Sequence, residues 1–277
     1  MLFRSDLYLA AEDYDAITSL FAQNEDWEGL ADVLSSAADR ATSTDAKIDL
    51  SYRTAEVFEQ RLGAPERAFR AYERVLSVCP TDLRAANALV PIYENDEQWS
   101  RLPALYEALL AQATDKDEQL ELLNKLAYVT GDRLSDKDAA LGYARRAYDL
   151  SPDAPGALEQ LQHRAKAAGS WQTFVDALES RLNNEPQMSS SLKRSLALRL
   201  AQVYGAELGR TDDAIKTYRA LVEQDPTDQE VISTLDGLLR AASRHDDLRW
   251  LFELRIGQAS DAEAVQMLRR PDRKSVV

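Results

Sequence analysis

Three tryptophans stand at a constant spacing in this chain, and that spacing constrains the fold more than any other feature of the sequence. Trp27, Trp99 and Trp171 follow one another with a period of 72. A shift of 72 followed by one of 74 superimposes seven further columns of identical residues. These columns are Leu50, Leu122, Leu196; Ala55, Ala127, Ala201; Val57, Val129, Val203; Leu62, Leu134, Leu208; Ala68, Ala140, Ala214; Pro80, Pro152, Pro226; and Leu89, Leu161, Leu235. Repetition at a fixed period predicts a chain of stacked, structurally equivalent units.

The change in the shift from 72 to 74 places a two-residue insertion between Trp171 and Leu196. We expect it in the polar stretch 183–191, because a surface turn accommodates extra residues and a packed helix does not.

Each unit of the repeat is predicted to hold four helices, which in the first unit span 27–41, 45–62, 65–78 and 82–95. Apolar residues at three-to-five-residue intervals give the second of these one apolar face. Gly63 suits a left-handed helix end, and Pro65 suits the first turn of the next helix. Pro80 stops the third helix, and the Thr81-Asp82 pair offers a cap for the fourth. Each unit is therefore two helical hairpins.

The segment 61–82 reads RLGAPERAFRAYERVLSVCPTD. It resembles the second half of a tetratricopeptide repeat, with Gly63, Ala68, Tyr72, Val75 and Pro80 at the family's spacings. A second copy repeats the pattern with Gly209, Ala214, Tyr218, Leu221 and Pro226. The middle copy keeps Ala140, Ala147 and Pro152 but has Ser135 for the glycine and Ala144 for the tyrosine. The hairpins between these copies, such as 82–113, diverge further from the family pattern.

This resemblance, to the long tetratricopeptide arrays of large bacterial proteins, implies an all-α fold. We expect a right-handed α-solenoid of stacked hairpins with about 15 helices, forming a single domain over 1–270. Its double-hairpin units lie near 27–98, 99–170 and 171–246, with partial units at 1–26 and 247–270. Both ends break within a unit, so we expect a fragment of a longer array.

The final residues, 271–277, are expected to be a non-native or disordered tail. The run from Asp272 to Val277 matches what a common sequencing adapter encodes just before a stop codon. An ordinary polar tail is the alternative.

Charge and composition limit the classes of partner. Forty-seven acidic and 33 basic residues give a net charge of -14, which disfavours nucleic acid unless basic residues cluster locally. No apolar run reaches the length of about 18 residues that a membrane span needs, so we expect no membrane insertion. The first residues do not form a secretory signal, and we expect a cytoplasmic protein. Cys79 is the sole cysteine, and with His163 and His245 it gives too few soft ligands to predict a metal or any other cofactor.

No catalytic motif is present in the sequence. There is no glycine-rich nucleotide loop, zinc-protease helix, nucleophile elbow or EF-hand loop, so we predict no enzymatic activity. His163 is interpreted as a surface or groove residue, and Cys79 as a packed group at a helix end. The acidic pairs Glu25-Asp26 and Asp246-Asp247 stand at predicted helix starts, where they favour the helix dipole. The repeated tryptophans are expected to pack between hairpins, with ligand stacking as the alternative.

In tetratricopeptide repeats the first helix of each hairpin lines a concave groove, and the resemblance therefore implies a set of groove residues. The candidates are Arg53, Arg84, Asn87, Lys125, His163 and Arg199, with Glu159, Lys166 and Arg240 on the same helices or their equivalents. Arg53, Lys125 and Arg199 occupy one column and would form a basic row. Such a row could bind an acidic or C-terminal peptide segment through charge-assisted hydrogen bonds. Salt bridges with acidic neighbours are the alternative.

Chaperone-binding members of the family place an asparagine four residues after such a base. This chain has Val57, Val129 and Val203 there, which argues against binding of chaperone tails.

These features predict a non-catalytic scaffold that binds peptide segments or partner proteins in its concave groove. One alternative is a regulatory or substrate-recruiting arm of a larger multidomain enzyme or signalling protein. A solenoid for RNA processing is a further alternative, which the sequence pI of about 4.7 disfavours.

Overall fold

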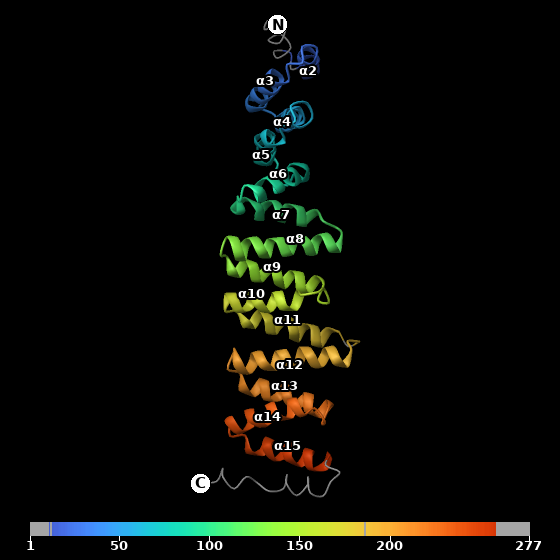
Figure 1. Ribbon diagram of the computed structural model, residues 1–277, viewed down its shortest axis with the longest axis vertical. Coiled ribbons are helices and arrows are strands. Elements are labelled where there is room, and N and C mark those ends of the chain that lie inside the picture. The colour runs from blue at the N-terminus through green and yellow to red at the C-terminus, as the bar shows by residue number, and fades with distance from the viewer. Residues whose placement is uncertain (1–10, 12, 186, 259–277) are drawn as a thin grey trace. The chain divides into compact units, whose positions relative to one another are not determined.

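The chain is helical throughout the part that the computed structural model describes, namely residues 11, 13–185 and 187–258 (Figure 1). These residues hold fourteen α-helices and no β-strand. The helices are α2 (Tyr14–Ala22), α3 (Trp27–Arg40), α4 (Thr44–Glu56), α5 (Phe69–Val78), α6 (Leu83–Asn95), α7 (Leu102–Gln112), α8 (Lys116–Tyr128), α9 (Lys137–Leu150), α10 (Ala157–Ala168), α11 (Trp171–Asn184), α12 (Ser190–Ala206), α13 (Thr211–Gln224), α14 (Gln229–Ala241) and α15 (His245–Gln258). The prediction of an all-α repeat fold is confirmed.

The four helices predicted for the first unit of the repeat are all present. They correspond to α3, to α4 with a π-helical turn η1 (Val57–Arg61), to a 3-10 turn η2 (Pro65–Arg67) with α5, and to α6. The second unit repeats the π-helical turn as η4 (Val129–Arg133) and opens with a 3-10 turn η3 (Trp99–Arg101) before α7.

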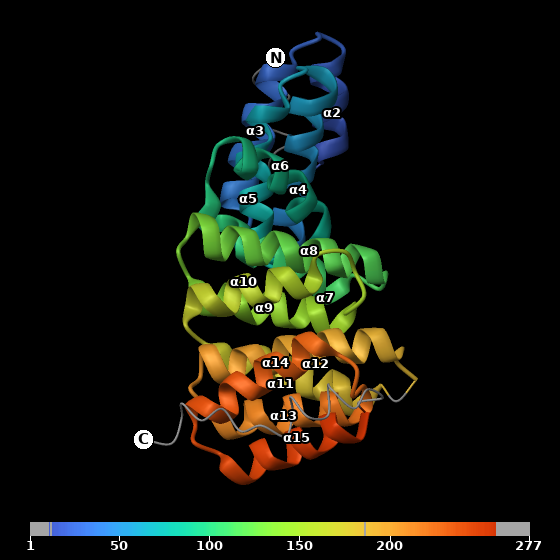
Figure 2. The ribbon, with the colours of Figure 1, turned by 60° about the horizontal axis from the view of Figure 1, so that its bottom comes forward.

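The helices group into two compact units, Met1–Ala157 and Leu158–Val277. Within the first unit, each of α2 to α8 packs against the helix that follows it. Within the second, the same holds from α11 to α15, which Figure 1 shows as successive layers and Figure 2 shows from another side. Packing between sequence neighbours is the arrangement that stacked hairpins require. A single domain over 1–270 stays a prediction, and the expected tail 271–277 and the end of the expected partial unit 247–270 lie outside the described residues.

The predicted two-residue insertion lies in the loop between α11 and α12. The equivalent loops of the earlier repeats, 41–43 and 113–115, have three residues each, whereas 185–189 has five. The helices on either side of the loop keep their register, so the insertion costs little packing.

Most columns of the repeat form the core. The leucines at 50, 122 and 196, the alanines at 55, 127 and 201, and the valines at 57, 129 and 203 are all buried. Removing such apolar side chains from water drives the stacking of the hairpins. The Leu62 column differs, because Leu134 stays 38% exposed.

The helix ends repeat as faithfully as the core. Asp26 and Asp82 accept a hydrogen bond from the third residue of α3 and of α6, at 3.0 and 2.9 Å. The capping role predicted for Thr81-Asp82 and for Glu25-Asp26 thus falls to the second residue of each pair.

Two columns of left-handed residues end the helices. Gly63, Ser135 and Gly209 form one column, with φ between 60° and 64°. Glu25, Glu97, Gly169 and Ser243 form the other, with φ between 55° and 66°. The second column was not anticipated, since glutamate rarely adopts this conformation.

Tyrosine hydroxyls join different elements of the stack, each by donating to a carboxylate. The pairs are Tyr52–Asp82, Tyr72–Glu59, Tyr93–Glu73, Tyr106–Glu94 and Tyr204–Glu179. In every pair, burial first and the nearby carboxylate second raise the pKa of the tyrosine.

Candidate functional site

The predicted groove residues all lie on the first helix of a hairpin. Arg53 is in α4, Arg84 and Asn87 are in α6, and Lys125 is in α8. The second compact unit carries His163 in α10 and Arg199 in α12.

A pocket of about 560 Å³ opens in the first unit on α2, α3 and α4. Two of the predicted groove residues, Arg53 and Arg84, line it together, and Asn87 and Lys125 do not. Its charged and aromatic lining is Trp27, Asp49, Tyr52, Arg53, Glu56, Arg61 and Arg84. The lining holds three guanidinium groups and two carboxylates, and Asp15 pairs with Arg53 from outside the lining, so Arg61 is the cation of the lining that has no described carboxylate partner.

Arg53 is held in place by two carboxylates. It donates to Asp49, one helical turn earlier, at 2.8 Å, and to Asp15 of α2. The hydrogen bond to Asp15 raises the pKa of Arg53 further above neutrality. Its side chain is still 34% exposed, so its pairing with Asp15, which is 85% exposed, is a solvated contact of small net value.

Arg84 lies over an aromatic ring. Its guanidinium carbon is 4.2 Å from the centre of the Tyr52 ring, and one of its nitrogens is 2.9 Å from Glu56. Tyr52 in turn donates to Asp82, the cap of α6. The ring therefore holds a cation on its face at the mouth of the pocket.

The other two members of the basic row are also ion-paired. Lys125 is 2.9 Å from Glu121 and 5.9 Å from the Tyr106 ring. In the second unit, Arg199 donates to Glu159 at 2.9 Å and to Gln162 at 3.0 Å. These contacts are the salt bridges with acidic neighbours that the sequence analysis gave as the alternative to peptide binding. Exposed pairs of this kind are worth about 0–1 kcal/mol, so a carboxylate brought by a partner could replace either acidic neighbour.

Three further residues named from the sequence are exposed. Asn87 on α6, and His163 and Lys166 on α10, present their side chains at least partly to solvent. Cys79 is a free, half-buried thiol at the end of α5.

Arg61 is the pocket arginine that the sequence analysis did not single out. Its guanidinium carbon lies 4.8 Å from the centre of the Trp27 ring. Arg133, one full period later in the sequence, lies 4.5 Å from the Trp99 ring. The signal was present in the sequence, since both arginines directly precede the leucines of the Leu62 column.

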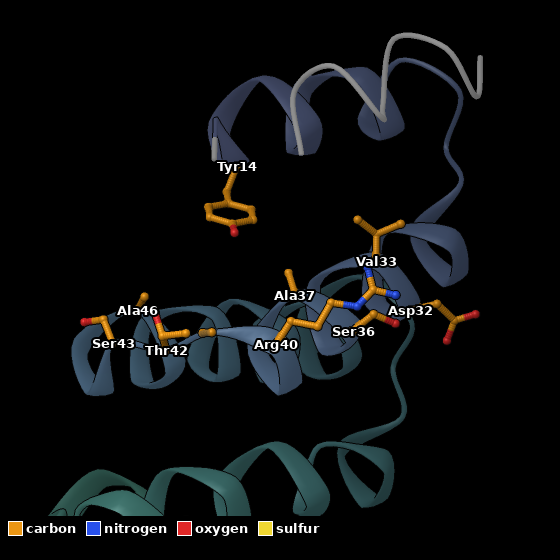
Figure 3. Close-up of a pocket in the computed structure, with 10 residues that line it drawn as sticks. Tyr14, Asp32, Val33, Ser36, Ala37, Arg40, Thr42, Ser43 and Ala46 are labelled. Carbon is orange, nitrogen blue, oxygen red and sulfur yellow. The ribbon is translucent and has the colours of Figure 1, made fainter. Parts of the chain in front are cut away.

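A second pocket of the first unit, of about 550 Å³, lies where α2 faces the end of α3 and the start of α4 (Figure 3). Its lining is mostly small side chains such as Ser36, Ala37 and Ala46, with Asp32 and Arg40 as its charged groups. None of the predicted groove residues reaches it. It offers no convergent set of polar groups that would orient a ligand.

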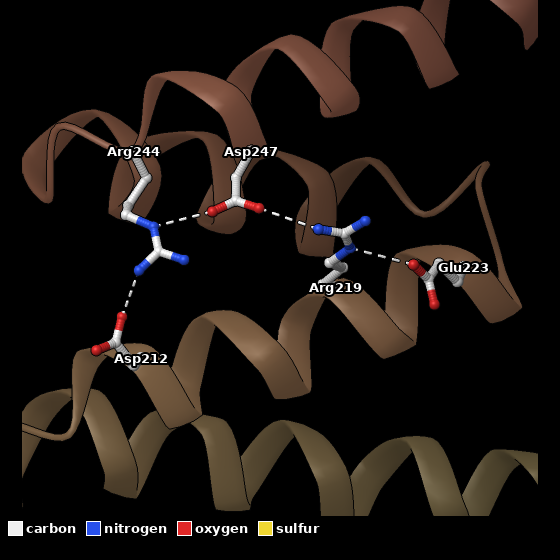
Figure 4. Close-up of polar contacts among 5 residues, drawn as sticks. All are labelled: Asp212, Arg219, Glu223, Arg244 and Asp247. Carbon is white, nitrogen blue, oxygen red and sulfur yellow. Dashed lines mark hydrogen bonds and ion pairs between the residues drawn. The ribbon is translucent and has the colours of Figure 1, made fainter.

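An ion-pair chain links α13 to α15 in the second unit (Figure 4). Asp247 accepts from Arg244 at 2.9 Å and from Arg219 at 3.0 Å. The chain continues from Arg244 to Asp212 and from Arg219 to Glu223. Every charge in it has a partner, so its role is to fix α15 on α13.

Within the described residues, no three His, Cys, Asp or Glu side chains gather as a metal site would require. The described helices include none with the length and apolarity to cross a bilayer.

Comparison with known proteins identifies one repeat directly. A sequence model of the tetratricopeptide repeat matches residues 195–228, which run from within α12 to the residue before α14. The two shifts of the repeat, 74 and then 72, map this segment onto 121–154 and 49–82, and the resemblance is most specific in the latter. Curated protein sequences give no match.

Two solved structures illustrate the similarity. One is YrrB, described as a TPR protein with an unusual peptide-binding site. Its sequence is 18% identical, the match covers 77% of this chain and 99% of YrrB, and the TM-score is 0.33. The other is TTC0263, a thermophilic TPR protein of Thermus thermophilus. Its sequence is 18% identical, the match covers 80% of this chain and 94% of TTC0263, and the TM-score is 0.28.

Proposed function

Because this chain contains tetratricopeptide repeats, we propose that it is a non-catalytic scaffold that binds peptide segments of partner proteins on the first helices of its hairpins. The pocket that Arg53 and Arg84 line together carries this proposal. It combines cations with aromatic surface, which is the composition of protein-binding hot spots.

The proposed ligand is an acidic segment in an extended conformation. The three guanidinium groups in the pocket suit carboxylates, and Tyr52 and Trp27 add apolar surface beside them. Asp49 and Glu56 already pair with Arg53 and Arg84, at 2.8 and 2.9 Å. A partner carboxylate would therefore exchange with solvated ion pairs, so each contact adds little affinity and the peptide needs several.

A displayed library of random twelve-residue peptides, selected on the full chain, tests this function. We expect the selected peptides to be enriched in Asp and Glu. Charge reversal of two of the three pocket arginines, Arg53→Glu with Arg84→Glu, should weaken their binding about tenfold or more, as measured by fluorescence anisotropy.

Arg146→Glu is the matched control for the single variant Arg84→Glu. Arg146 is in the same unit, is 52% exposed against 55% for Arg84, pairs with Glu107 and lies 5.7 Å from the Tyr143 ring. It differs in lying on a second helix, α9, and should leave binding unchanged. Equal losses in the two variants would mean that net charge, and not the pocket, sets the affinity.

A further inference from the structure

Two arginines, one full period apart in the sequence, make the same unusual contact in the first unit. Arg61 ends the π-helical turn η1 and lies over Trp27, and Arg133 ends η4 and lies over Trp99. Neither tryptophan is fully buried. The same tryptophan, arginine and turn thus recur as a set.

The π-helical turn is part of this set. Leu62 donates its backbone N–H to the carbonyl of Val57 at 3.1 Å, and Leu134 donates to Val129 at 3.0 Å. Each turn carries one residue more than an α-helical turn, and the arginine stands at its last position. Single π-helical turns inside α-helices are rare and occur frequently at functional sites.

Arg61 and Arg133 belong to a minority of the described arginines, which also includes Arg40 and Arg70, that form no ion pair with a described carboxylate. Among the described residues, most arginines contact a carboxylate within 4.0 Å, but no carboxylate lies within that distance of Arg61 or Arg133. Two acidic residues close in sequence to Trp27 and Arg61 are engaged by other side chains. Arg67 holds Glu28 with two hydrogen bonds of 2.6 and 2.8 Å, and Tyr72 donates to Glu59 at 2.6 Å.

A guanidinium stacked on a ring keeps the N–H groups at its edge available. The ring restricts its motion, so a carboxylate can accept two parallel hydrogen bonds with little further ordering. Both arginines are exposed. In a chain of net charge -14, two exposed cations without a described acidic partner are suited to an acidic ligand.

The surroundings of Arg133 add apolar surface. Tyr128, 42% exposed, has its ring 5.3 Å from the guanidinium, and Leu134, 38% exposed, follows directly in sequence. They are two of the three large apolar side chains that are exposed within the described part of the chain. An apolar residue beside the bound acid would cover them.

We infer that Arg61 and Arg133 are paired carboxylate receptors that bind two acidic side chains of one extended peptide. This inference rests on the proposed peptide-binding function and gives it a spacing rule. Two hairpins separate the two sites. If each hairpin counts as one layer of the stack and packed layers lie roughly 10 Å apart, the sites are about 20 Å apart. An extended chain covers that distance in about six residues.

Synthetic fluorescent peptides test the rule on the full chain. One peptide carries two glutamates six residues apart in an uncharged background, a second carries them three residues apart, and a third has glutamines in their place. We expect the six-residue spacing to bind at least about tenfold more tightly than either of the others, because only it can occupy both sites at once.

Two single variants, Arg61→Gln and Arg133→Gln, should each reduce the six-residue peptide to the affinity of the three-residue peptide. The double variant should abolish the difference between glutamate and glutamine. Both arginines are exposed, so unchanged circular dichroism and thermal midpoints will show that the variants fold. Equal affinity for the two spacings in the parent chain, or an unaffected double variant, would overturn the inference.

The variant Arg53→Glu with Arg84→Glu separates the two proposals. If it loses binding of the library-selected peptides while Arg61→Gln with Arg133→Gln retains it, the groove function stands and the paired receptors do not exist. If no selected or synthetic peptide binds the parent chain, both proposals fail.

Discussion

The first two repeats and the third differ at positions that the period makes equivalent. Trp27 and Trp99 are partly exposed and carry an arginine on the ring, whereas Trp171 is 8% exposed and packs edge-on against Phe174 with ring centres 6.0 Å apart. Phe174 stands where the earlier repeats have leucine, and Glu207 stands where they have Arg61 and Arg133.

The helix that carries this glutamate ends with the same bond. Leu208 donates its backbone N–H to Val203 at 3.1 Å, as Leu62 and Leu134 do to Val57 and Val129, and Glu207 adds an α-helical bond of 3.1 Å to the same carbonyl. The hairpin frame is the same in all three repeats. A few side chains therefore decide whether one tryptophan serves the core or the surface.

The largest effect that this comparison predicts is on stability. Trp171→Ala should lower the free energy of unfolding by about 3–5 kcal/mol, the usual cost of deleting a buried aromatic side chain. Trp27→Ala, at the equivalent but partly exposed position, should cost roughly 1–2 kcal/mol. Urea denaturation followed by circular dichroism measures both.

Trp27→Phe is the control for this pair, since it keeps an aromatic ring under Arg61. It should cost less than Trp27→Ala. If Trp27→Ala were as damaging as Trp171→Ala, both tryptophans would be core residues and the distinction between the repeats would be wrong.

Alkaline pH should affect the two compact units differently. Tyrosine hydroxyls donate to carboxylates at Tyr52, Tyr72, Tyr93 and Tyr106 in the first unit, and burial and Glu107 raise the pKa of Tyr143 there to about 12. In the second unit the described pair of this kind is Tyr204–Glu179.

The direction of the effect follows from the raised pKa values. Unfolded tyrosines lose their protons near pH 10, while the folded ones retain theirs. The unfolded state then binds fewer protons, so stability is complete below about pH 10 and falls as the pH rises above it. We expect the first unit to unfold at a lower pH than the second.

Tryptophan fluorescence can follow each unit separately. A variant that keeps only Trp99 reports on the first unit. A variant that keeps Trp171 and Trp250 reports on the second, because the buried Trp171 must stay in place where that unit is measured. Tyr72→Phe removes a titrating group and should move the Trp99 transition to higher pH. Simultaneous transitions, or an earlier one at Trp171 and Trp250, would contradict the assignment.

The sequence predicted what depends on local chemistry and periodicity. Apolar columns, Gly63 at a left-handed helix end and Asp82 as a cap act within one helix or one turn, and the structure has all three. The two-residue insertion was located for the same reason, since only a loop accepts it.

The candidate site was harder to predict, because it depends on which charges pair across helices. Nothing in the sequence shows that Arg67 takes Glu28 while Arg61 is left on Trp27. The left-handed Glu25 and Glu97 were missed as well, although Gly169 in the same column marked the position. Arg53, Lys125 and Arg199 of the basic row form ion pairs with acidic residues of the chain. The role of this row in binding a partner stays a prediction.

The smallest predicted effect concerns the column of left-handed residues Gly63, Ser135 and Gly209, each of which directly follows the leucine of the Leu62 column. Ser135 has φ 60°, as Gly63 does, and a side chain in this conformation costs about 1 kcal/mol. A Cβ added at Gly63 would meet no atom within 4 Å, so the cost there is one of backbone conformation alone. Ser135→Gly should therefore stabilise the chain, and Gly63→Ser should destabilise it, each by roughly 1 kcal/mol.

The two substitutions exchange the same pair of residues in opposite directions, so their effects in urea denaturation should be equal in size and opposite in sign. Gly209→Ser, with φ 64° and an equally open environment, extends the comparison to the third repeat. A similar cost there would mean that the turn is common to all three repeats and that only the tryptophan and its partner distinguish them. A cost at Gly209 well above that at Gly63 would instead place part of the difference in the backbone itself.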